Sequence, residues 1–164
     1  MKNSQGRYGY KPFDEWAWRS YDGKNKVDIL EFIKSKNKDN LFFIGTDSQN
    51  YSKKRICLFT SVLIAYRMKM GGSVVLHRDS VPYMDSLRQR LLMEAMRSLE
   101  VGWWLTQHIP MENVIGIHLD VNQSLKFKSG QYKDELIGLV ASQGFRALVK
   151  PDAWAASSVA DSKT

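Results

Sequence analysis

Two aspartates directly follow apolar runs of the sequence. Asp47 ends the stretch LFFIGTD, and Asp120 ends the stretch IGIHLD. A carboxylate that is buried without a partner costs free energy and tends to protonate. If the two stretches are parallel neighbouring strands, both carboxylates lie at the same end of the sheet, where their like charges repel. A divalent cation would resolve that conflict, whereas the alternative is that each aspartate independently caps a turn.

Two further carboxylates belong to predicted helices. Glu94 falls on a largely apolar stripe of the helix predicted over residues 85–107, so we expect it to face the sheet. Glu100 is the competitor on another face, and Glu94 is preferred because it lies nearer the helix start. The alternative role for Glu94 is an ion pair with an arginine. Asp161 lies on a predicted C-terminal helix. Taken alone it would be interpreted as a solvated charge, and only the other three carboxylates make it a candidate site residue.

Oxygen ligands of this kind select a hard cation. Carboxylates without cysteines or paired histidines suit Mg²⁺ or Mn²⁺. Zinc is disfavoured because the three histidines, His77, His108 and His118, are scattered and lack ligand spacing. Two such ions about 4 Å apart can activate a water molecule and stabilise the leaving oxygen in phosphodiester hydrolysis. The carboxylates therefore predict nuclease chemistry.

Alternating strands and helices must position these groups. The patterns predict five strands and four helices in one domain: strands over 41–47, 56–66, 73–81, 114–121 and 147–150, and helices over 26–37, 85–107, 131–143 and 152–163. Short connections make the first three strands an antiparallel meander. Helical crossovers then place the last two strands parallel to the first. The fold class is α/β with a mixed sheet, preceded by an aromatic and charged extension, residues 1–25.

Charge and composition limit the class of protein. Lysine and arginine outnumber aspartate and glutamate by 24 to 17, giving a net charge of +7 and a pI near 9.5. Residues 52–79 hold six of the basic residues against one aspartate, so nucleic acid is the expected partner. No apolar run is long enough to span a membrane, and the N-terminus lacks the apolar core of a signal peptide. The single cysteine, Cys57, fits a reducing, cytoplasmic setting.

Four motifs carry a resemblance to a known family. They are IGTDSQ at 44–49, LEVGWW at 99–104, HLDVN at 118–122 and KPDAWAASSVAD at 150–161. Together they resemble the ribonuclease H-like superfamily and, more closely, the YkuK-like family of predicted ribonuclease H-related proteins. The resemblance covers residues 26–164 and leaves the extension outside it.

The resemblance implies a five-stranded sheet in the order 3-2-1-4-5 with helices on both faces. It also implies a two-metal nuclease site at Asp47, Glu94, Asp120 and Asp161. In this hypothesis Asp47, Asp120 and Glu94 hold one Mg²⁺ or Mn²⁺, and Asp47 with Asp161 holds the other. The substrate would be RNA, DNA or an RNA–DNA hybrid.

Two other functions are consistent with the same residues. A non-catalytic module would bind nucleic acid through the basic hairpins of residues 52–79 and the N-terminal aromatic side chains. An interaction protein would present Trp103, Trp104 and the aromatic extension to a partner. His118 shares a strand face with Asp120 and either contacts the substrate, helps with proton transfer or forms a hydrogen bond at the strand end. Ser48, Gln49 and Asn122 either bind phosphate or sugar or are loop formers.

Overall fold

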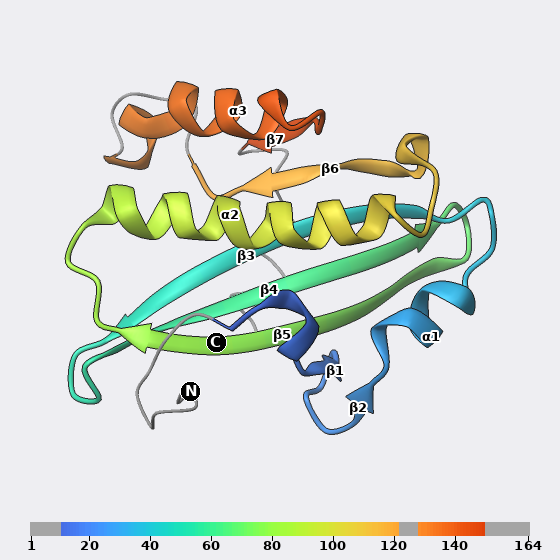
Figure 1. Cartoon of the computed structure of the whole chain (residues 1–164), viewed down its shortest axis with the longest axis horizontal. Coiled ribbons are helices and arrows are strands. Elements are labelled where there is room, and N and C mark those ends of the chain that lie inside the picture. The colour runs from blue at the N-terminus through green and yellow to red at the C-terminus, as the bar shows by residue number, and fades with distance from the viewer. Residues whose placement is uncertain (1–10, 122–127, 150–164) are drawn as a thin grey trace.

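Three long antiparallel strands form the centre of the protein. The computed structural model describes residues 11–121 and 128–149 (Figure 1). Strands β3 (Leu41–Tyr51), β4 (Ile56–Arg67) and β5 (Gly71–Pro82) pair in unbroken register. The turns between them are short and each contains a non-glycine residue of positive φ. The expected meander is confirmed, but β3 continues four residues beyond its predicted end at residue 47.

Two parallel strands extend the meander on the β3 side. Strand β6 (Val114–Leu119) pairs parallel with β3, and β7 (Ala147–Val149) pairs parallel with β6. The crossover from β5 to β6 contains α2 (Leu87–Thr106), which Ser86 caps by accepting a hydrogen bond from the backbone N–H of Gln89. The crossover from β6 to β7 contains α3 (Lys133–Ser142). The described residues also form three 3₁₀ turns: η1 (Phe13–Glu15), η2 (Met111–Asn113) and η3 (Lys128–Tyr132).

The sheet has seven strands within the described residues, so the prediction of a five-stranded sheet is wrong. Strands β1 (Trp18–Ser20) and β2 (Lys26–Val27) lie at the outer edge of β5, and the full order is β2-β1-β5-β4-β3-β6-β7. The five predicted strands keep the expected order relative to one another within it. The two added strands were missed because they are only three and two residues long and show no alternation of apolar and polar side chains.

All three described helices pack on the same face of the sheet. Helix α1 (Ile29–Lys34), α2 and α3 contribute to one hydrophobic cluster with the inward side chains of β3, β4 and β6. Figure 1 shows α2 lying across this face, with α3 beside β6 and β7. The helix predicted over residues 152–163 lies outside the described residues. Helices on both faces therefore remain a prediction.

The described part of the N-terminal extension joins the core. Trp16 and Trp18 are buried in the same hydrophobic cluster as α2, and Phe13 packs partly against it. The indole N–H of Trp16 donates a hydrogen bond to the backbone carbonyl of Lys11 at 3.0 Å. Within residues 11–121 and 128–149, no helix combines the length and apolar character needed to cross a membrane.

Candidate functional site

Helix α2 brings a buried carboxylate over the C-terminal half of strand β3. Glu94 is only 6% exposed, and the hydroxyl of Ser48 donates a hydrogen bond to its Oε2 at 2.5 Å. Glu100, the alternative candidate on the same helix, is half-buried. Glu94 is therefore the α2 carboxylate that meets the sheet at this end. The helical period explains this, because Glu94 shares a stripe with the buried Leu91 and Val101.

A second carboxylate lies close enough to Glu94 to affect its charge. Burial raises the pKa of Glu94 from an ordinary 4.5 to about 8; the Ser48 hydrogen bond opposes this rise, and the negative charge of Asp120 adds to it. Both acidic residues line one crevice together with Thr46 and Leu136. The crevice has no room for a water molecule. Glu94 is thus largely protonated near neutral pH in the absence of a cation, as expected for two carboxyl groups that share a buried site.

Asp47 lies on the opposite face of the sheet from Glu94. Its neighbours in β3 both contact α2: Thr46 hydrogen-bonds Ser98 at 2.9 Å, and Ser48 hydrogen-bonds Glu94. Because successive side chains of a strand alternate between faces, Asp47 points away from α2. Its partner on β4 is Thr60, which is fully buried.

Strand register nevertheless brings Asp47 and Asp120 to the same end of the sheet. Gly45 of β3 pairs with His118 of β6, and each aspartate lies two residues beyond its member of this pair. His118 is 1% exposed, and its ring meets that of Phe43 edge-on at 5.5 Å on the face away from α2. Burial lowers the pKa of His118 to about 4, so its imidazole is neutral near neutral pH.

The predicted site residues thus fall into separate groups. Glu94 and Asp120 share a crevice, whereas Asp47 lies on the other face of β3. Asp161 and Asn122 lie outside the described residues. Among residues 11–121 and 128–149, no group of three or more histidine, cysteine, aspartate and glutamate side chains is arranged to hold a metal ion.

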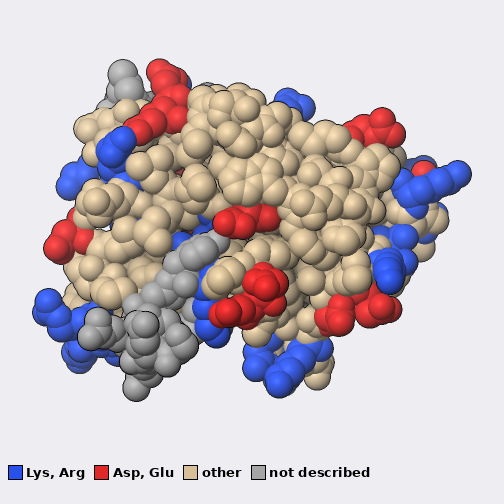
Figure 2. All heavy atoms as spheres, in the orientation of Figure 1, with Lys and Arg blue, Asp and Glu red and all other residues tan. Residues whose placement is uncertain are grey.

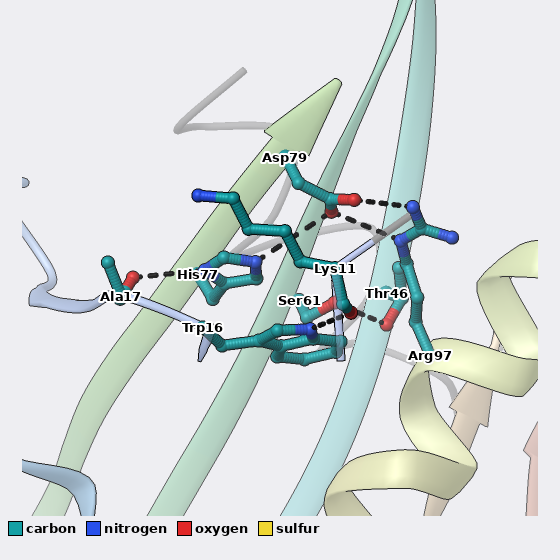
Figure 3. Close-up of polar contacts among 8 residues, drawn as sticks. All are labelled: Lys11, Trp16, Ala17, Thr46, Ser61, His77, Asp79 and Arg97. Atoms are coloured by element: carbon teal, nitrogen blue, oxygen red, sulfur yellow. Dashed lines mark hydrogen bonds and ion pairs between the residues drawn. The ribbon is translucent and has the colours of Figure 1, made fainter. Parts of the chain in front are cut away.

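A buried ion-pair network beneath α2 was missed by the sequence analysis (Figure 3). Arg97 donates to Asp79 of β5 through Nε at 3.1 Å and through Nη2 at 2.5 Å. Its guanidinium lies 4.0 Å above the ring of Phe59. Asp79 and Arg97 are both almost completely buried. Bidentate pairing with the planar guanidinium offsets much of the cost of removing both charges from water.

His77 connects this network to the N-terminal extension. Its Nδ1 donates to the carbonyl of Ala17 at 3.0 Å, its Nε2 lies 3.9 Å from Asp79, and its ring stacks on Trp16 at 4.4 Å (Figure 3). Burial lowers the pKa of His77. The signal for this network was the alternation along residues 73–81, since His77 and Asp79 share a strand face with the core residue Val75.

Basic side chains divide between the two ends of the meander. Lys53, Lys54 and Arg55 are exposed in the β3–β4 turn, at the same end as Ser48, whereas Arg67 and Lys69 lie at the β4–β5 turn. The twelve residues of β4 separate these groups by about 36 Å. Figure 2 shows basic side chains mostly at the margins of the α2 face, with acidic ones interspersed. The cationic stretch of residues 52–79 is therefore not one patch.

The comparisons with known proteins identify a family. Residues 26–164 match the family described as ribonuclease H-like. No match was found among curated proteins or among solved structures. The matched segment contains the β3–β4–β5 meander, α2 and the parallel strands β6 and β7. Because the match covers most of its length, the chain belongs to the ribonuclease H-like family.

Proposed function

We propose that the protein is a nuclease that depends on Mg²⁺ or Mn²⁺ and hydrolyses phosphodiester bonds in RNA, DNA or an RNA–DNA hybrid. The observation that carries this proposal is the pairing of the buried Glu94 with Asp120 at the ends of the central strands of a ribonuclease H-like chain. Strongly perturbed carboxyl groups in a crevice are common at functional sites. Family membership alone supports only a role connected with nucleic acid.

The residues fit a hard divalent cation by donor type. Glu94 and Asp120 offer carboxylate oxygens, and the hydroxyl of Ser48 orients Glu94 from the adjoining strand. When bound, the cation would supply activation of a water molecule and stabilisation of the leaving oxygen. The proposed two-metal site also includes Asp47, from the C-terminal half of β3, and Asp161, which lies outside the described residues.

Geometry sets one condition on this site. The crevice between Glu94 and Asp120 must open to admit a cation, because it has no room for a water molecule. Asp47 would join from the opposite face of β3, at the level where strand β6 has ended and Asp120 follows it. The exposed lysines and arginine of the β3–β4 turn, at this end of the sheet, would contact phosphates of the substrate.

Cleavage assays with matched variants test the proposal. Fluorescently labelled RNA, DNA and hybrid duplexes are incubated with the protein in Mg²⁺, in Mn²⁺ or in EDTA. Wild type should cleave at least one of these substrates in Mg²⁺ or Mn²⁺, and it should cleave none of them in EDTA. Glu94→Gln and Asp120→Asn should each reduce kcat/KM at least about a hundredfold, which corresponds to about 2.7 kcal/mol.

Glu100→Gln is the control, because Glu100 lies on the same helix and is only partly buried. It should cleave like wild type. Activity that survives in the Glu94→Gln, Asp120→Asn double variant would exclude the proposed site. Nucleic-acid binding that is tight, independent of cations and never followed by cleavage would instead indicate a non-catalytic binding module.

A further inference from the structure

A cavity on the face of the sheet opposite α2 is lined by two arginines. Its volume is about 270 Å³, and the described residues around it are Ala17, Arg19, Gly23, Leu76 and Arg78. Arg19 pairs in register with Leu76, whose side chain belongs to a hydrophobic cluster on this opposite face. The two arginine side chains therefore lie on the same side of the sheet, one contributed by β1 and the other by β5.

The electrostatics of the cavity favour an anion. No acidic side chain is among its described lining residues. Within the part of the chain that the structure describes, neither Arg19 nor Arg78 forms an ion pair. Asp22, in the turn that follows β1, already accepts hydrogen bonds from Ser20 at 2.6 Å and from the backbone N–H of Lys24 at 3.0 Å. Two guanidinium groups around one cavity present planar arrays of donors that match the oxygens of a phosphate.

Register places this cavity in line with Asp47. Arg78 of β5 pairs with Thr60 of β4, and Thr60 pairs with Asp47 of β3. The three residues thus form a row across adjacent strands on one face of the sheet. Since neighbouring strands lie about 4.8 Å apart, the backbone at Arg78 is about 10 Å from the backbone at Asp47. About three nucleotides of a B-form strand, at roughly 3.4 Å each, span that distance along the helix axis.

We propose that the Arg19–Arg78 cavity is a phosphate-binding subsite that holds one phosphate of a nucleic-acid backbone about 10 Å from Asp47. The choice of ligand rests on the proposed function. Arg19 lies before the segment that matches the ribonuclease H-like family, so β1 adds this subsite to the matched segment. A single guanidinium would attract an anion, but the pair from two strands also fixes its position between them.

Salt-dependent binding tests the subsite. A fluorescein-labelled hybrid duplex and a single-stranded RNA are titrated by fluorescence polarisation in EDTA, so that binding is measured without cation-dependent cleavage. The logarithm of the binding constant is plotted against the logarithm of the salt concentration. In the Arg19→Gln, Arg78→Gln double variant the slope should fall by about 1, as expected for the loss of one phosphate contact.

Arg67→Gln with Lys69→Gln is the matched control, because it removes the same charge at the β4–β5 turn. Its slope should equal that of wild type. Three outcomes would each overturn the subsite. The slope could be the same for wild type and the Arg19, Arg78 variant, it could fall equally in both variants, or wild type could fail to bind. Cleavage by wild type with Mn²⁺ is scored separately. Binding that meets the prediction without cleavage therefore contradicts only the nuclease proposal, and cleavage with unchanged slopes contradicts only the subsite.

Discussion

The buried carboxyl group of Glu94 should make the stability of the protein depend on pH. Its pKa is about 8 in the folded chain against an ordinary 4.5, so between these values the folded state holds a proton that the unfolded state has released. Stability therefore falls as pH rises through this window. At about 1.4 kcal/mol per pKa unit, the full effect is about 5 kcal/mol. Between about pH 5.5 and about pH 8.5 the expected loss is about 3 kcal/mol.

Glu94→Gln isolates this effect, because glutamine keeps the shape of the side chain and does not titrate. Urea unfolding of wild type and variant is followed by tryptophan fluorescence at both pH values, in EDTA to exclude cations. Wild type should lose about 3 kcal/mol relative to the variant on going from the lower to the higher pH. The titrations of His77 and His118 occur in both proteins and cancel. A difference between the two proteins that does not change with pH would refute the account of Glu94.

Two packing features and one ion pair give further predictions. Gly102→Ala should destabilise the protein by about 1–3 kcal/mol in thermal unfolding, because the new Cβ would lie 2.8 Å from the ring of Phe145. Gly138→Ala, in α3, should instead stabilise it by about 0.5–1 kcal/mol, since nothing lies within 4 Å of the added carbon; equal effects at the two glycines would contradict this packing. Arg97→Met should cost about 3–5 kcal/mol in urea unfolding by leaving the carboxylate of Asp79 buried without its partner. Adding Asp79→Leu should recover most of that loss, and a double variant no more stable than Arg97→Met would be evidence against the ion pair as the cause.

Much of the central fold could be predicted because its signals are local. Long apolar runs separated by short polar turns indicated the β3–β4–β5 meander, and the apolar stripe of α2 indicated which side of the helix is buried. The parallel direction of β6 followed from its helical crossover, and its place beside β3 was implied by the family resemblance. The edge strands β1 and β2 could not be predicted, because they depend on pairing with β5 and on the burial of Trp16 and Trp18 in the core.

The face on which Asp47 lies was not predictable from the sequence. Apolar side chains of β3 lie on both of its faces, with Phe42 and Ile44 in the α2 cluster and Phe43 in the cluster on the other face. The stretch LFFIGTD therefore has no alternation of apolar and polar residues to assign its faces. Only the contacts of Thr46 and Ser48 with α2 decide the question. Glu94 could be assigned because a helix with one buried stripe does mark its inner side.

The short strands at both edges of the sheet affect how the protein can be shortened. In the part of the chain that the structure describes, the outermost strands, β2 and β7, are two and three residues long, so they offer few unpaired backbone groups on which another chain could assemble. A chain trimmed to residues 26–164, the limits of the family match, would lose β1 and uncover backbone groups of β5. It would also remove Trp16 from the ring of His77. Such a shortened chain should aggregate more readily than the full chain, and recombinant production is better begun before Lys11.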